Sequence, residues 1–190
     1  MLELIKLTTF FFVLFDPLAS LTVFYLATKR MSVYERNKIA FFAVAAAAIL
    51  SFGTLILGEN LLTIFNTDID NFRIAGGIIL ILLGIRVVLG YPLTNDLSKG
   101  RGQAIASIIA TPLLTGPAVM SALIVVRHDY GLSIVALAVS IVLVITWLVF
   151  HNAHFAYEKI GGKITQVLST FLGLVTVAWG VNFLRVALGF

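Results

Sequence analysis

The chain has 190 residues, of which 60% are hydrophobic and 12% charged, with a formal net charge of +4 and a mean hydropathy of +1.06. Soluble domains are about 45–50% apolar and about 25% charged, so this composition excludes an ordinary water-soluble domain and predicts an all-α integral membrane protein. The basic residues lie mostly in short gaps between apolar runs, as they do in membrane proteins, so we predict no nucleic-acid partner. The absence of cysteine excludes disulfides, cysteine-ligated zinc and iron–sulfur clusters.

Six apolar runs are long enough to cross a hydrocarbon core of about 30 Å, which requires about 20 helical residues. They lie near residues 4–27, 39–58, 72–91, 104–126, 131–151 and 165–188. The first run could be a signal peptide, because Leu18-Ala19-Ser20 resembles a cleavage site. Hydrophobicity resumes directly after Ser20, so we interpret the run as a retained transmembrane helix.

The two halves of the chain resemble each other. The third run ends in RVVLGY and the sixth in RVALGF, at an offset of 99 residues, and Pro17 and Pro117 lie in the first and fourth runs at an offset of 100. We therefore predict six transmembrane helices arranged as two three-span repeats, residues 1–91 and 104–190, joined by a cytoplasmic linker over 92–103. An odd number of spans per repeat inverts the second repeat, which is an architecture of secondary transporters.

The distribution of lysine and arginine predicts the orientation in the membrane. The odd-numbered loops and their flanks hold nine of these residues: Lys29, Arg30, Arg36, Lys38, Arg86, Lys99, Arg101, Lys159 and Lys163. The opposite side holds four: Lys6, Arg73, Arg127 and Arg185. Because cytoplasmic loops carry the excess of basic residues, we expect a plasma-membrane protein with both termini extracellular.

The first and fourth runs contain three of the four prolines, at Pro17, Pro112 and Pro117. A proline inside a helix removes a backbone donor and clashes with the preceding turn, at a cost of about 3 kcal/mol. In lipid, the freed backbone groups survive only where protein or a water-filled cavity surrounds them. We therefore predict that spans one and four are discontinuous.

Two interrupted helices brought together would form a binding site for a small zwitterion. A half-helix beginning at Pro17 or Pro117 offers unpaired N–H groups and a positive dipole end, and the preceding half-helix ends in unpaired carbonyl groups. The carboxylate of a ligand would bind at the N-termini and its amine at the C-termini. The alternative is a pair of proline kinks that only help the helices to pack.

Asp16 is the one acidic side chain deep inside a predicted span, where a charge costs about 2.5–3.5 kcal/mol on insertion scales. It is either a cap for the half-helix that begins at Pro17, or a group that holds the substrate amine or carries the coupling ion; these roles are not exclusive. Our predicted substrate site comprises Asp16, Pro17, Ala19, Ser20, Gly76, Gly77, Thr111, Leu114, Thr115, Gly116, Pro117 and Ser121.

Several of these candidates have a simpler interpretation. The serine and threonine hydroxyls can bond back to their own helices. Gly76 and Gly77 are more simply explained by close helix packing, unless they contact the broken helices. His151 and His154 have no carboxylate at a matching spacing, so we interpret them as an interfacial cluster and predict no metal site.

The chain resembles the MarC/SnatA family of bacterial and archaeal membrane proteins over essentially its whole length. The resemblance depends on Arg73-Ile74-Ala75-Gly76-Gly77, on Gly116-Pro117 and on the paired proline motifs. It implies secondary transport of small neutral amino acids such as glycine and alanine. The first motif of the family usually reads Asn-Pro, whereas this chain has Asp16-Pro17, a difference that either changes ion coupling or preserves the helix cap.

We therefore expect a transporter of a small neutral amino acid, driven by a proton or sodium gradient, with no cofactor. The chain has no nucleophile elbow, His-Glu-x-x-His pair, pair of buried carboxylates or P-loop, which argues against an enzyme and against intrinsic use of ATP. The alternatives are a channel, an exporter of another solute, or a non-transporting scaffold. Assembly into a homo-oligomer is compatible with the sequence.

Overall fold

The computed structural model describes residues 1–64, 66–90 and 114–190, without the side chains of residues 59 and 61, and every regular element in these ranges is an α-helix. The helices are α1 (Leu2–Phe15), α2 (Pro17–Thr28), α3 (Val33–Ile64), α4 (Ile69–Val88), α6 (Pro117–Tyr130), α7 (Leu132–His151), α8 (Ala153–Ile160) and α9 (Gly162–Ala187). The predicted all-α class is therefore confirmed for the described residues.

Five segments of the described chain are long and apolar enough to cross a membrane. They are Leu2–Thr28, Val33–Gly58, Ile69–Val88, Leu132–His151 and Gly162–Ala187. Helix α6 has 14 residues, about 21 Å at 1.5 Å per residue, and is too short to cross alone. The remainder of the predicted fourth span and the predicted linker at 92–103 lie outside the described residues, so the fourth span as a membrane crossing and the repeat boundaries stay predictions.

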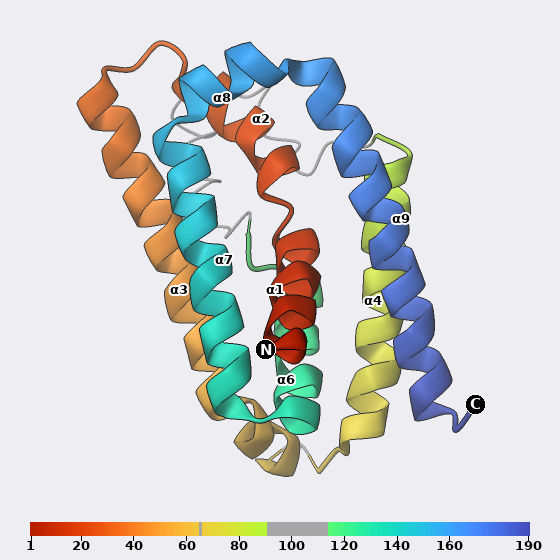
Figure 1. Cartoon of the computed structure of the whole chain (residues 1–190). Coiled ribbons are helices and arrows are strands. Elements are labelled where there is room, and N and C mark those ends of the chain that lie inside the picture. Colours follow the sequence, from red (N-terminus) through yellow and green to blue (C-terminus); the bar gives the residue numbers. More distant parts are fainter. Residues whose placement is uncertain (65, 91–113) are drawn as a thin grey trace.

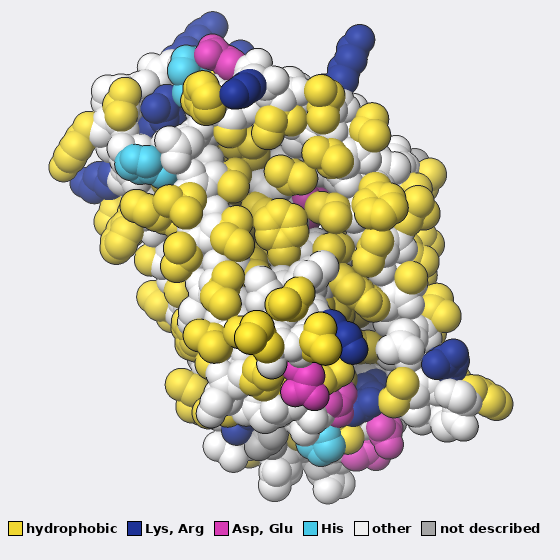
Figure 2. Space-filling model, viewed as in Figure 1, with side chains coloured by type: hydrophobic (Ala, Val, Ile, Leu, Met, Phe, Trp, Pro, Cys, Tyr) yellow, Lys and Arg dark blue, Asp and Glu magenta, His cyan; other side chains and the backbone are white. Residues whose placement is uncertain are grey.

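The two short helices α1 and α6 lie at the centre of the molecule, with the pair α3 and α7 on one side and the pair α4 and α9 on the other (Figure 1). In an apolar 18-residue window of Leu2–Thr28, 67% of the window is buried inside the protein. The corresponding share in the other four candidate spans is 22–33%. Large exposed hydrophobic side chains, such as Phe41, Val144 and Phe171, cover the outer helices. Figure 2 shows this apolar surface across the middle, with charged side chains gathered toward the two ends. The first span is therefore enclosed by protein, while the outer helices face lipid.

The first span is interrupted at Asp16. Its backbone adopts the left-handed conformation (φ 37°, ψ 65°), and its N–H group donates to the carbonyl oxygens of Phe12 and Val13 at 3.2 Å each. Helix α2 begins at the next residue, Pro17, which has no N–H group to donate. Asp16 thus ends one half-helix and caps the next (Figure 1).

The predicted break in the fourth span is described on one side only. Helix α6 begins at Pro117, and its N-cap residue Gly116 is extended (φ −81°, ψ 179°) and makes no side-chain capping bond. Residues 104–113, which would form the preceding half-helix, lie outside the described residues. The first-turn N–H groups of α6 therefore have no acceptor within their own helix and none from the Gly116 cap.

Helices α4 and α9 approach each other through glycines. A Cβ atom added to Gly77 would lie 2.7 Å from the carbonyl oxygen of Gly180, and one added to Gly84 would lie 2.6 Å from that of Gly173. Gly76 faces a different helix, because its added Cβ would lie 3.0 Å from the Cβ of Ser121 in α6. Of the two predicted site glycines, Gly77 is explained by packing against α9, and Gly76 lies against α6.

Candidate functional site

A cavity of about 140 Å³ lies where α1 ends and α6 begins. Helices α4 and α9 form its other walls. Its lining consists of Val13, Leu14, Phe15, Asp16, Ile79, Leu83, Val87, Leu114, Gly116, Pro117, Ala118, Val119, Gly173 and Thr176. Since a water molecule needs only about 10–15 Å³ of such space, the cavity has room for a small organic molecule. The two proline motifs, 100 residues apart in sequence, thus border one space.

The wall of this cavity is apolar apart from a few groups. Asp16 and Thr176 are the polar side chains among its lining residues, and Asp16 is the ionisable one. The Thr176 hydroxyl donates to the carbonyl oxygen of Leu172 in its own helix at 2.9 Å. Residues at the C-terminal end of α1 and the N-terminal end of α6 also form part of the wall. An apolar pocket with a small number of polar groups that fix orientation is typical of small-molecule sites.

The Asp16 carboxylate links the interrupted first span to α9. Its Oδ1 atom accepts a hydrogen bond from the backbone N–H of Ala19 at 3.1 Å and a longer one from the Ser169 hydroxyl at 3.4 Å. Both side chains are buried, with 8% and 6% of their residue surfaces exposed. The first contact is a helix cap, and the second holds the carboxylate from a helix 153 residues away.

Ser169 was not among the predicted site residues. A signal was available, because small and hydroxyl-bearing residues recur every three or four positions along α9 and form one helix face. They are Thr165, Ser169, Gly173, Thr176 and Gly180, all of them buried in the bundle. Such a face in an otherwise apolar span predicts a helix contact or a polar site.

Four of the predicted site residues line the cavity: Asp16, Leu114, Gly116 and Pro117. Thr111 lies outside the described residues. The other seven predicted substrate-site residues are not among the residues that line this cavity: Pro17, Ala19, Ser20, Gly76, Gly77, Thr115 and Ser121. Nearness to a break in sequence therefore does not by itself place a residue on the cavity wall, and Gly76 and Gly77 belong to α4, far from both breaks in sequence.

The predicted hydroxyls have different surroundings. The Ser121 hydroxyl donates to the Pro117 carbonyl oxygen at 2.9 Å, which is the back-bonding alternative. The Thr115 hydroxyl donates to the carbonyl oxygen of Ala47 in α3 at 3.4 Å. The Ser20 oxygen is buried and has no hydrogen-bond partner among the described residues.

His154 lies 3.3 Å from the carboxylate of Glu158, one turn further along the exposed helix α8, so the premise that these histidines have no carboxylate at a matching spacing was wrong for His154. Within the described ranges, no group of three or more His, Cys, Asp or Glu side chains is arranged to hold a metal ion.

Comparison with known proteins identifies the family. The sequence model of the MarC family of integral membrane proteins matches residues 1–189. A UPF0056 membrane protein of Buchnera aphidicola subsp. Schizaphis graminum is 29% identical over 92% of this chain and 86% of its own. The UPF0056 membrane protein YhcE of Escherichia coli is 27% identical over 91% and 86% of the two chains, and a UPF0056 protein of Methanocaldococcus jannaschii is 29% identical over 91% and 89%. No solved structure matches the chain.

The family match covers both proline motifs and all the described helices, in agreement with the resemblance noted from Arg73–Gly77 and Gly116-Pro117. This chain therefore belongs to the MarC family of integral multi-pass membrane proteins.

Proposed function

We propose that this chain is an inverted-repeat secondary transporter of small neutral amino acids such as glycine and alanine, driven by a proton or sodium gradient. One observation carries the proposal: the C-terminal end of α1 and the N-terminal end of α6 border the same small cavity inside the apolar bundle. Helix ends of opposite polarity that meet in a membrane protein are a recognised way to hold a charged substrate near the midplane.

The chemistry of the cavity suits a zwitterion. Ala118 and Val119 lie in the first turn of α6, where N–H groups have no partner within the helix, and both residues line the cavity. These donors and the positive end of the helix dipole would bind a carboxylate. The Asp16 carboxylate and the last carbonyl groups of α1 would bind the ammonium group across the cavity. A small apolar side chain would then lie against Leu83 and Val87.

The packing of the helices supports the repeat. Helix α4, the third predicted span, packs along α9, the sixth, and α3, the second, packs along α7, the fifth. These are the pairs that a two-fold axis in the membrane plane would place side by side. Asp16 is then the candidate for ion coupling, and movement of the interrupted helices against the outer pairs would provide alternating access.

The proposal is tested by counterflow of labelled glycine in proteoliposomes, with uptake then measured under imposed proton and sodium gradients. We expect saturable exchange that competes with unlabelled alanine, and uptake that depends on one of the two gradients. Non-saturable flux would favour a channel. The absence of flux with glycine and alanine would remove the proposed substrate class.

A topology experiment checks the predicted orientation. Figure 1 shows both chain ends toward the end of the molecule opposite to α8. A reporter fused after Phe190 is expected to read as extracellular, whereas the same reporter inserted between Gly161 and Gly162 is expected to read as cytoplasmic. A cytoplasmic signal from the Phe190 fusion would invert the orientation.

Ser169→Ala is expected to reduce glycine exchange about two- to tenfold, because it removes the hydroxyl that donates to Asp16 while leaving the cap at Ala19 in place. The matched control is Thr170→Ala, since the exposed Thr170 hydroxyl donates only to Gln166 of its own helix among the bonds described. Initial rates of counterflow provide the measurement. Equal rates in the two variants would show that the contact of Ser169 with Asp16 has no role in exchange.

A further inference from the structure

A second, larger cavity lies nearer to the two chain ends. It measures about 810 Å³ and opens between α1, α4, α6 and α9. We refer to it as the vestibule and define it by the polar side chains of Lys6, Arg73, Asp129 and Asn182 and the rings of Phe10 and Trp179. No residue lines both the vestibule and the cavity at Asp16.

An aromatic partition separates the two cavities. Along α1, Phe10 lines the vestibule and Val13 lines the cavity at Asp16. Along α9, Trp179 lines the vestibule and Thr176 lines the cavity at Asp16. Three helical residues correspond to about 4.5 Å along α1 and α9, and the separation is wider along α4, from Arg73 to Ile79, and along α6, from Val119 to Val126. The rings of Phe10 and Trp179 lie on the vestibule side of this separation, with their centroids 4.5 Å apart. The vestibule thus lies in line with the cavity, on the side of the chain ends.

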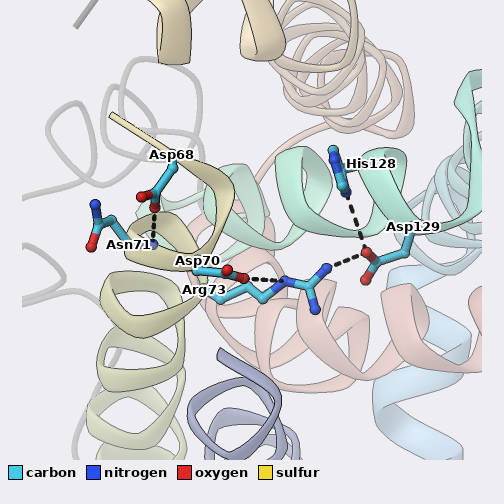
Figure 3. Close-up of polar contacts among 6 residues, drawn as sticks. All are labelled: Asp68, Asp70, Asn71, Arg73, His128 and Asp129. Carbon is cyan, nitrogen blue, oxygen red and sulfur yellow. Dashed lines mark hydrogen bonds and ion pairs between the residues drawn. The ribbon is translucent and has the colours of Figure 1, made fainter. Parts of the chain in front are cut away.

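The vestibule contains an ion pair between two helices. The guanidinium of Arg73, at the start of α4, bonds to the carboxylate of Asp129, near the end of α6 (Figure 3). The Arg73 side chain is only 11% exposed, and its Nε atom, 3.8 Å from Asp70, has no hydrogen-bond partner among the described residues. Asp129 is 32% exposed and lies 3.5 Å from His128. A guanidinium has five N–H donors in a planar fork, so Arg73 retains donors for a second carboxylate.

We propose that the vestibule is a second binding site for a small zwitterionic amino acid, with Arg73 and Lys6 binding its carboxylate and Asp129 its ammonium group. The choice of ligand rests on the proposed function, but the site is independent of Asp16. Both signs of charge line one hollow, and Trp179 lines it too, an aromatic ring of the kind that attracts an ammonium group. A cavity of this volume with a few converging polar groups is within the usual range for ligand sites. Ligand held here would lie about one helical turn from the central cavity along α1 and α9.

The test is the number of labelled glycine molecules bound per chain, measured by equilibrium dialysis of the purified protein over micromolar to millimolar glycine. Three proteins are compared: wild type, Asp16→Ala, and the double variant Arg73→Gln/Asp129→Asn. The double variant removes both charges together, so neither partner is left buried without the other. We expect two molecules per wild-type chain and one in each variant.

The outcomes separate this site from the proposed function. If wild type binds one glycine per chain, and this binding persists in Asp16→Ala but is lost in the double variant, the vestibule is a binding site and the cavity at Asp16 is not. If wild type binds one glycine and this binding persists in the double variant, the vestibule is not a binding site. If wild type binds no glycine, both proposed sites are wrong.

A second measurement does not depend on the folding of the double variant. The chain has two tryptophans, so Trp147→Phe leaves Trp179 as the sole indole reporter in the vestibule. We expect glycine to change its emission saturably, with Asp16→Ala leaving this change intact and Lys6→Gln weakening the apparent affinity at least threefold. An emission insensitive to glycine, or a change lost in Asp16→Ala and unaffected by Lys6→Gln, would overturn the proposal.

Discussion

Asp16→Ala is expected to reduce glycine counterflow in proteoliposomes to the background of empty vesicles. Alanine removes the oxygen that accepts from the Ala19 N–H group, a capping loss of about 0.5–2 kcal/mol. It also places a residue without a local hydrogen bond in the left-handed conformation at φ 37°, at a further cost of about 1–2 kcal/mol. The cap that stabilises the break between α1 and α2 and the charge in the cavity are therefore lost together. Full exchange in this variant would remove Asp16 from the mechanism.

Asp16→Asn separates these two effects. Asparagine is as good an N-cap as aspartate and tolerates the left-handed conformation, so the break and the cavity are expected to survive. The side chain can no longer carry a proton or neutralise a sodium ion. We expect glycine exchange to persist while uptake driven by the imposed gradient falls to the level without a gradient. If gradient-driven uptake equals that of wild type, Asp16 acts only as a cap.

The interruption at Asp16 could be predicted from sequence because its causes are local. Proline lacks a backbone N–H donor in any context, and an aspartate before it can cap the helix that the proline begins. Two adjacent residues were therefore sufficient to predict the interruption. Span positions could be predicted for a similar reason, since hydropathy over about 20 residues reflects a fixed membrane thickness. The N-terminal part of the fourth span, residues 104–113 with Thr111 among them, falls outside the described residues and remains a prediction.

The contacts that complete the site could not be predicted in this way. Ser169 and Asp16 are 153 residues apart, and one sequence gives no means of pairing them. The same holds for the ion pair of Arg73 and Asp129, which are 56 residues apart: sequence analysis used Arg73 only for orientation and for the family resemblance. Gly77 was recognised as a packing residue, but its partner Gly180 was not, because small residues identify a contact face without identifying the helix that fits it.

Gly84→Ala is expected to give the largest loss of stability among conservative changes in α4. The added Cβ would lie 2.6 Å from the carbonyl oxygen of Gly173 and 2.9 Å from the backbone nitrogen of Val177. Backbone atoms cannot turn aside as a flexible side chain can, so α4 and α9 must separate. Overpacking of this kind costs about 1–3 kcal/mol, which for a chain of this length lowers Tm by on the order of 2–10 °C. Thermal unfolding of the detergent-purified protein, followed by circular dichroism, measures the shift.

The matched control is Gly53→Ala in α3, where an added Cβ meets no atom within 4 Å. Alanine is the better helix former by about 1 kcal/mol, so the control is expected to keep or slightly raise Tm. Gly84→Ala is also expected to alter the candidate site, because Gly173 lines the cavity beside Asp16 and moves with α9 when α4 is pushed away. Glycine exchange is therefore expected to fall in Gly84→Ala and to be unchanged in Gly53→Ala. If the two variants melt alike, α4 and α9 do not approach at Gly84 and Gly173, and the wall that these helices give the cavity would have to be placed differently.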